Sequence, residues 1–341
     1  MPAPISDSQT ISDIAPYLEA HVPGFRGPVT DVQKTAQGQS NPTYIVTAAS
    51  GKYVIRRKPD GELLKSAHAV DREYRVLSAL RDTDVPVPDA LHLCEDESVL
   101  GTMFYVMSFV QGQNWVDPRL KGENRDMRVA VYDSMNATLA ALHSVEPAEV
   151  GLSDYGPPGN YFERQVGRWS KQYRACETET IEPMEELIAW LDAQTPPEGP
   201  ARLAHGDWRI DNLLFDASGQ CNAVLDWELS TLGHPLADLG TQIMQWQLPP
   251  GTEGRGLMGV DRAELGIPED DAYAELYAKR VGLSQAPDLD YPVAFAFFRM
   301  AAIIQGVKKR ALDGNASNPE SGLKMGAYVP MFAQAALTRI K

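Results

Sequence analysis

Two short stretches place the strongest constraint on what this chain can fold into. Residues 204–215 read AHGDWRIDNLLF, and residues 223–228 read AVLDWE. The runs 213–215 and 223–225 are apolar, and the turn-forming segment 216–220 joins them, so together they predict a β-hairpin. The side chains of Asp207 and Asn212 are expected on the loop that enters this hairpin, and that of Asp226 where the hairpin ends. The pattern therefore predicts one site with two acids and an amide.

These side chains suit phosphoryl transfer to a hydroxyl group. A carboxylate has to orient the hydroxyl and accept its proton, and oxygen ligands have to hold Mg²⁺ on the nucleotide. Asp207 is the predicted base, and Asn212 and Asp226 are the predicted Mg²⁺ ligands. Glu228 is expected to reach a second ion or to support these ligands. The same spacing, H-x-D-x-x-x-x-N followed by an acid, occurs in protein kinases.

Arg209 lies two positions after Asp207 on the same loop. It is a candidate contact for the γ-phosphate, where an arginine stabilises charge that develops during transfer. The alternative is an arginine that only pairs with Asp211. His205 is expected to brace the loop by hydrogen bonding rather than to move a proton.

At these motifs the chain resembles the aminoglycoside phosphotransferase and choline kinase superfamily, whose members carry H-G-D-x-x-x-x-N and then an I-D motif. It is most similar to the branch that includes the kinase-like domains of acyl-CoA dehydrogenase family members ten and eleven. The similarity to this branch rests on residues 53–59, 67–74 and 298–306, and it extends over nearly the whole chain from about residue 25. It also implies that Asp238, in the phrase G-x-P-x-x-D-L-G, braces the catalytic loop.

The resemblance implies an α+β, two-lobed protein-kinase-like fold. Residues 1–111 are expected to form a nucleotide-binding lobe with a small antiparallel sheet, and residues 1–24 a loose lead-in with a helix at 11–20. Residues 112–341 are expected to form a mainly helical lobe with the catalytic hairpin 203–228 and acceptor-binding helices. The patterning predicts strands at 29–36, 43–47, 52–57, 89–94 and 102–109, and helices at 67–80, 124–144, 161–175 and 183–194. A further helix is expected from 235, and an exposed insertion at 248–268.

ATP is the expected cofactor together with Mg²⁺. The turn around Gly38, with Ser40 and Asn41, is a candidate cover for the phosphates; the alternative is a plain hairpin turn. Arg56 stands where kinases carry a lysine, and its predicted partner is Glu73 on the following helix. This substitution departs from the general pattern, and the two cations are not interchangeable.

The resemblance implies two further kinds of contact. Backbone groups from Ser108 to Val110 are expected to bind the adenine edge. Arg299 and Gln305 are expected to contact the acceptor.

Composition limits the partners. The net charge of −15 over 341 residues argues against nucleic acid, because a phosphate-backbone binder presents a basic face. No apolar run is long enough to span a bilayer, and the first residues, which lack a basic and an apolar region, are not expected to act as a signal peptide. With three scattered cysteines, these features favour a cytoplasmic protein. The oligomeric state is not determined by the sequence.

The resulting prediction is an ATP- and magnesium-dependent kinase for a small hydroxylated molecule. Resemblance to the acyl-CoA dehydrogenase-linked branch points to a hydroxyacyl-CoA or a hydroxy acid, and the wider superfamily points to an aminoglycoside or an amino alcohol such as choline. Two other classes stay open. One is a catalytically silent nucleotide-binding module, and the other is an unrelated hydrolase in which Asp207 and Asp226 hold metal.

Overall fold

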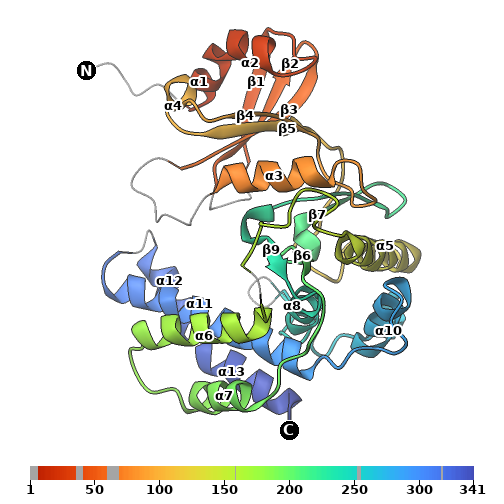
Figure 1. Ribbon diagram of the computed structural model, residues 1–341, viewed down its shortest axis with the longest axis vertical. Helices are drawn as coiled ribbons and strands as arrows, with labels where there is room; N and C mark the ends of the chain where they lie inside the picture. The colour runs from red at the N-terminus through yellow and green to blue at the C-terminus, as the bar shows by residue number, and fades with distance from the viewer. Residues whose placement is uncertain (1–6, 36–40, 60–68, 158, 252–254, 316–317) are drawn as a thin grey trace. The chain divides into compact units, whose positions relative to one another are not determined.

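Contacts along the chain divide it into two units. The first consists of Met1–Asn114, Val150–Leu152 and Asn212–Ser230, and the second of Trp115–Glu149, Ser153–Asp211 and Thr231–Lys341. The computed structural model (Figure 1) describes residues 7–35, 41–59, 69–157, 159–251, 255–315 and 318–341. The expected α+β class is confirmed, since strands form the sheet of the first unit and helices make up most of the second.

The first unit contains the predicted antiparallel sheet, which has five strands in the described part of the chain. Their order is β1-β2-β3-β5-β4, and α3 (Val70–Leu80) follows β3 in the sequence. The bounds are β1 (Val29–Lys34), β2 (Thr43–Ala48), β3 (Gly51–Arg57), β4 (Ala90–Cys94) and β5 (Phe104–Ser108). A short helix between the last two strands, α4 (Glu97–Leu100), was not predicted; the side chain of Asp96 caps it by accepting from the Ser98 amide.

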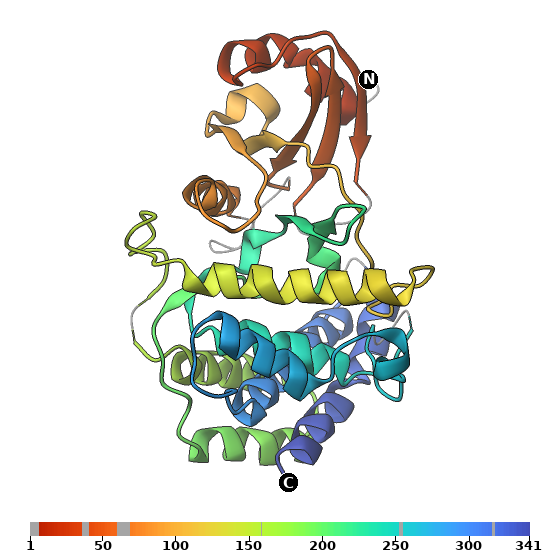
Figure 2. The ribbon, with the colours of Figure 1, turned by 90° about the vertical axis from the view of Figure 1, so that its right-hand side faces the viewer.

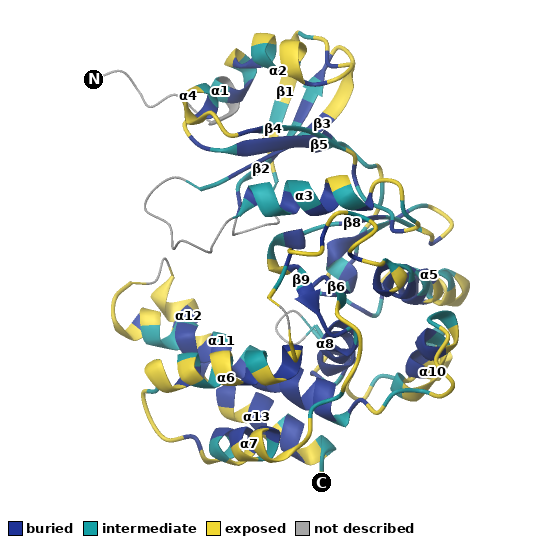
Figure 3. Ribbon diagram, in the orientation of Figure 1, coloured by how far each residue is buried: buried dark blue, intermediate teal, exposed yellow. Residues whose placement is uncertain are grey.

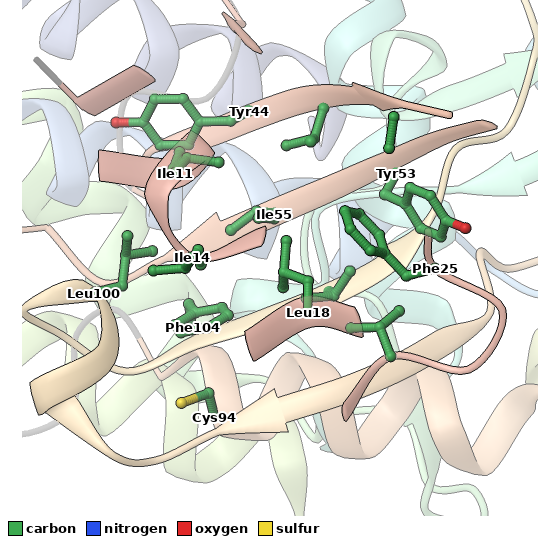
Figure 4. Close-up of a cluster of buried hydrophobic side chains, with 14 residues drawn as sticks. Ile11, Ile14, Leu18, Phe25, Tyr44, Tyr53, Ile55, Cys94, Leu100 and Phe104 are labelled. Atoms are coloured by element: carbon green, nitrogen blue, oxygen red, sulfur yellow. The ribbon is translucent and has the colours of Figure 1, made fainter. Parts of the chain in front are cut away.

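One face of the sheet is covered by the N-terminal segment. Instead of one helix in a loose lead-in, this segment has two, α1 (Asp7–Asp13) and α2 (Ala15–His21). Ile11, Ile14 and Leu18 pack against sheet residues such as Ile55 and Phe104 (Figure 4). The apolar residues recur every three or four positions, so the helices bury them together on one side.

The predicted catalytic hairpin is present and belongs to the first unit, although the sequence grouped it with the helical lobe. It consists of β7 (Leu213–Phe215) and β8 (Cys221–Val224). Two backbone bonds join Gln113 and Phe215, at 2.8 and 2.9 Å, and the Val224 amide donates to the Pro86 carbonyl. Gly112 allows this approach, because a Cβ there would lie 2.9 Å from that of Leu214. These bonds tie the hairpin to the segment that follows β5 and to the segment between α3 and β4.

The second unit is mainly helical, as expected, and α11 is its central element. It contacts α6, α7, α8, α12 and α13, and most of its side chains are buried, as expected for a helix surrounded by other helices. Every residue of α8 is also buried (Figure 3). The helices are α5 (Arg125–Ser144), α6 (Tyr161–Ala175), α7 (Glu182–Ala193), α8 (Leu236–Trp246), α9 (Arg262–Leu265), α10 (Asp270–Arg280), α11 (Asp290–Leu312), α12 (Pro319–Gly326) and α13 (Val329–Arg339).

The predicted catalytic loop, which begins at His205, follows a short strand of the second unit. The strands β6 (Arg202–Ala204) and β9 (Thr231–Gly233), which were not predicted, pair antiparallel, and β6 ends just before the loop begins.

Helices α5 and α10 lie side by side (Figure 2), and the Asn136 amide of α5 donates to the Tyr273 carbonyl of α10 at 2.9 Å. None of the described helices is both long enough and apolar enough to cross a membrane.

Candidate catalytic loop and nucleotide-binding residues

A buried aspartate on α8 holds the loop that carries Asp207. The Asp238 carboxylate accepts from the His205 amide at 2.6 Å and from the Gly206 amide at 2.8 Å. Gly206 has a φ of 84°, a left-handed conformation that glycine adopts without strain. The expected bracing role of Asp238 is confirmed by these bonds. They fix the backbone immediately before Asp207.

Asp238 is fully buried, and its charge has several partners. His143 Nε2 lies 3.3 Å from Oδ2, and the other ring nitrogen of His143 bonds the Tyr277 hydroxyl at 2.8 Å. Burial alone would raise the pKa of the Asp238 carboxyl, but His143, His205 and the Gly206 amide together hold that pKa below its usual range. The carboxylate therefore stays ionised and keeps accepting hydrogen bonds.

The side chains of the loop form a chain of alternating charges within the second unit. Arg209 Nε lies 3.0 Å from Asp207 Oδ1, and Arg209 Nη1 lies 3.4 Å from Asp211 Oδ2. Arg255 donates to the same Asp211 oxygen at 3.0 Å. His205 Nδ1 accepts from the Asp207 amide at 3.3 Å, in line with its expected bracing role. Sequence reasoning did not find Arg255, because it lies 44 positions from Asp211 in an insertion.

The two residues expected to contact the acceptor have other partners. Arg299 donates to the Gly206 carbonyl at 2.9 Å, so it supports the catalytic loop, and its guanidinium lies over the Trp169 ring at 6.0 Å. Gln305 is fully buried, and its amide donates to the Cys176 carbonyl and to the Thr178 hydroxyl. The Gln305 side chain thus faces the segment after α6 and is not presented to an acceptor in this structure.

In the first unit, the hairpin brings Asn212 and Asp226 to the same end. Asn212 ends the short helix η1 (Ile210–Asn212), and its carbonyl accepts from the Leu225 amide at 2.8 Å. Asp226 follows with φ 63° and ψ 62°, a left-handed conformation that is uncommon outside glycine and is better tolerated by aspartate than by most residues. Such backbone strain recurs at functional sites. Glu228 lies just beyond, in the short helix η2 (Trp227–Leu229).

Arg56 of β3 connects this hairpin end with α3. Its Nη2 donates to Asp226 Oδ1 at 2.6 Å and lies 3.6 Å from Glu228 Oε2. Its Nε lies 3.0 Å from Glu73 Oε2, so the predicted pair with Glu73 is present. Glu73 also accepts from the Asn41 amide at 2.8 Å and from the Tyr105 hydroxyl at 3.1 Å. The Arg56 guanidinium therefore lies within 4 Å of three carboxylates, those of Glu73, Asp226 and Glu228.

The charges in this cluster depend on one another. Burial opposes the charge on Arg56, but Glu73, Tyr105 and Asp226 more than offset this and raise the pKa of Arg56 above its usual value. Burial also raises the pKa of Glu73, to about 7, although Arg56 acts to lower it. Repulsion from Asp226 and Glu228 adds to this rise. The arginine therefore stays charged, and its surroundings carry excess negative charge.

The donor set at the hairpin end is compatible with Mg²⁺. Asn212 and Asp226 offer hard oxygen ligands, and the Asp226 carboxylate already pairs with one cation, the guanidinium of Arg56. Among the described residues, no group of three or more His, Cys, Asp or Glu side chains could hold a metal ion alone. Mg²⁺ at phosphate sites commonly has one or two protein carboxylates and completes its shell with phosphates and water.

The remaining nucleotide-site expectations have different outcomes. Gly38 and Ser40 lie outside the described residues. Asn41 is fully buried and binds Glu73, so its side chain supports the ion pair. Ser108 ends β5; its amide donates to the Asp89 carbonyl, and its hydroxyl accepts from the Asp89 amide, both at 2.9 Å. Val110 follows β5 and is partly exposed.

Comparison with known proteins gives one family. The model of the phosphotransferase enzyme family matches residues 31–277. Acyl-CoA dehydrogenase family member 10 from Mus musculus is 45% identical over 283 residues, and family member 11 from Rattus norvegicus is 38% identical over 333 residues. These alignments cover 82% and 94% of this chain, but only 26% and 42% of the relatives. The chain thus spans less than half the length of these two proteins.

Solved structures agree with this result. A Ralstonia eutropha protein, provisionally named an aminoglycoside phosphotransferase, is 43% identical, with a TM-score of 0.87 and coverage of 97% of this chain and 98% of that chain. A thermostable mutant of the aminoglycoside phosphotransferase APH(4)-Ia, in a ternary complex with ADP and hygromycin B, has a TM-score of 0.62 at 14% identity, and the match covers 97% of this chain and 98% of that chain. At that identity, the second likeness shows the fold alone.

Proposed function

This chain belongs to the phosphotransferase enzyme family, and from that premise we propose that it is an ATP- and magnesium-dependent kinase acting on the hydroxyl group of a small molecule. The observation that carries the proposal is the anchored catalytic loop. The backbone before Asp207 is bound by the buried Asp238, while the Asp207 side chain remains about one quarter exposed. A fixed backbone with an accessible carboxylate is what a positioned base requires.

The proposed transfer assigns one task to each group. Asp207 orients the acceptor hydroxyl and takes its proton as the oxygen attacks the γ-phosphorus. The bond from that phosphorus to the β–γ bridging oxygen breaks, and ADP leaves with the electron pair. Arg209 stabilises the charge that develops on the γ-phosphate oxygens. Arg56, oriented by Glu73, binds phosphate oxygens of the nucleotide.

Asn212 and Asp226 would hold Mg²⁺, which when bound neutralises phosphate charge. Glu228 lies near the same guanidinium as Asp226 and would support that ligand. Retention of the base, the amide and the acid favours an active kinase over a catalytically silent nucleotide-binding module. Arg56, which stands where kinases carry a lysine, can take over that role because it keeps the positive charge and forms the ion pair with Glu73.

We further propose that the acceptor is anionic, such as a hydroxyacyl-CoA or a hydroxy acid. Arginines lie close to the predicted catalytic loop: Arg299 donates to the Gly206 carbonyl at 2.9 Å, and its guanidinium lies 6.0 Å from the ring centroid of Trp169 on α6, the helix that also carries Arg164 and Arg168. An aminoglycoside would instead need carboxylates around its ammonium groups. Two of the acids at the start of α10, Asp270 and Glu269, pair with Arg262.

The test is a screen of acceptors, with ADP release as the readout. Hydroxyacyl-CoA thioesters and free hydroxy acids are compared with kanamycin and choline at equal concentrations, with and without Mg²⁺. Magnesium-dependent ADP release with the anionic acceptors, and a phosphorylated product by mass spectrometry, is the expected result. Efficient phosphorylation of kanamycin or choline alone would overturn the acceptor class. No MgATP binding and no ADP release with any acceptor would overturn the kinase assignment.

A further inference from the structure

Arg209 lies between two carboxylates that compete for it. Its Nε is 3.0 Å from Asp207 Oδ1, and its Nη1 is 3.4 Å from Asp211 Oδ2. The Asp211 side chain is only 10% exposed, compared with 24% for Asp207. A less hydrated carboxylate attracts a cation more strongly, because water screens it less. Without a second cation at Asp211, the balance would favour movement of Arg209 toward Asp211.

Arg255 provides that second cation. Its Nη1 donates to Asp211 Oδ2 at 3.0 Å, closer than the 3.4 Å separating the same oxygen from Arg209. Asp211 thus receives positive charge from the insertion as well as from its own loop. Arg209 can then keep its contact with Asp207.

The backbone conformation at Arg255 and the contacts of the next residues place its side chain beside Asp211. Arg255 has a φ of 50°, a left-handed value that is uncommon for a residue with a long side chain. The next residue, Gly256, lies so close to the end of α8 that a Cβ would be 1.9 Å from the Leu248 carbonyl oxygen. The Gly256 amide donates to the Pro249 carbonyl, and the Leu257 amide donates to the Trp246 carbonyl. These contacts anchor the segment after Arg255 to the last residue of α8, the helix that also carries Asp238, and to the residues that follow it.

We propose that Arg255 is a positioning residue for phosphoryl transfer: by holding Asp211, it keeps Arg209 beside Asp207. This inference rests on the proposed function and adds a specific role for the insertion. Arg255 acts through Arg209 and touches neither substrate nor nucleotide. Its loss lets Asp211 draw Arg209 away from Asp207, and so removes charge stabilisation that matters most in the transition state.

The test uses MgATP hydrolysis, with water as the acceptor and ADP release as the readout. Arg255→Ala is expected to lower kcat by roughly tenfold while KM for MgATP changes by less than about threefold, since the lost interaction is made chiefly in the transition state. Arg255→Lys, which keeps the charge, should recover most of the activity. Arg174→Ala is the matched control: Arg174 is similarly exposed and also pairs with acids, Glu177 and Glu185, but it does not contact the catalytic loop.

A double variant separates positioning from a purely structural role. In Arg255→Ala combined with Asp211→Asn, the amide no longer competes for Arg209, so kcat should rise back to within a few-fold of the wild type. If Arg255→Ala retains wild-type kcat, or if the double variant is no better than Arg255→Ala alone, the positioning role is overturned. Melting temperatures identify any variant whose loss of activity is a loss of folded protein, and the suppression by Asp211→Asn would not follow from such a loss.

A structural measurement tests the inference independently of turnover. In a crystal structure of Arg255→Ala, Arg209 should lie closer to Asp211 than to Asp207. An unchanged Arg209 would overturn the inference whatever the activity. Failure of the wild-type protein to bind MgATP would instead count against the proposed function, so the two failures are distinguishable.

Discussion

Replacing Asp238 by asparagine tests the support of the catalytic loop. The carboxylate accepts from two backbone amides, at 2.6 and 2.8 Å, and lies 3.3 Å from His143 Nε2, and the residue is fully buried. Asparagine has almost the same shape but only one acceptor oxygen. The NH₂ group of the asparagine would therefore face the backbone N–H of either Gly206 or His205, and two donors cannot form a hydrogen bond with each other.

The expected loss of stability follows from these contacts. A hydrogen bond to a charged group contributes about 1.5–3 kcal/mol, and a buried N–H without a partner costs about 1–3 kcal/mol. Because the two effects overlap, we expect the free energy of unfolding of the second unit to fall by about 3 kcal/mol. Urea unfolding followed by tryptophan fluorescence measures this, since Trp208 and Trp246 are buried in that unit. Asp133→Asn is the control; its side chain is 54% exposed and pairs with Arg280, so a loss below about 1 kcal/mol is expected.

The pH dependence provides a second check. The pKa of Asp238 in the folded protein lies below its ordinary value of 3.8. Its contribution is therefore fully present above the pKa of the unfolded chain and is lost as the pH falls through the lower folded value. The stability difference between wild type and Asp238→Asn should be constant at neutral pH and shrink below about pH 4. A difference under about 1 kcal/mol at pH 7, or one that grows on acidification, would refute the reasoning.

Three further substitutions test the proposed chemistry. Asp207→Ala should leave MgATP binding largely intact but reduce phosphoryl transfer by roughly 100-fold or more, as expected for loss of a positioned base; turnover within a few-fold of wild type would remove Asp207 from that role. Asp226→Asn should raise the Mg²⁺ concentration needed for nucleotide binding, because an amide replaces an anionic ligand, and an unchanged midpoint in a Mg²⁺ titration would place the ion elsewhere. Arg56→Lys should raise KM for MgATP several-fold, since an ammonium lacks the planar fork that reaches both Glu73 and Asp226; steady-state kinetics with an unaltered KM would contradict this.

Local patterns in the sequence were sufficient to predict much of the fold. The strands of the sheet and several helices were predicted from residue patterning, and α6 begins and ends where the sequence indicated. Asn124 and Asn160 cap α5 and α6, as their side chains accept from amides three residues on. The catalytic hairpin followed from two apolar runs and a turn. These features depend on neighbours a few positions apart, so short stretches of sequence contain the necessary information.

Contacts between distant segments were decided by the tertiary structure. Periodicity indicates that a helix face is buried, but not what covers it. The sequence therefore left the N-terminal segment as a lead-in, whereas its helices cover the sheet. Gln305 was expected to contact an acceptor but donates to the Cys176 carbonyl. Asn41 was expected to bind phosphates, whereas in the folded chain it binds Glu73. Asp226 lies 170 positions from Arg56, and Asp211 lies 44 positions from Arg255. Only the packed chain brings these charges together, because each pair depends on the path of every segment between its members.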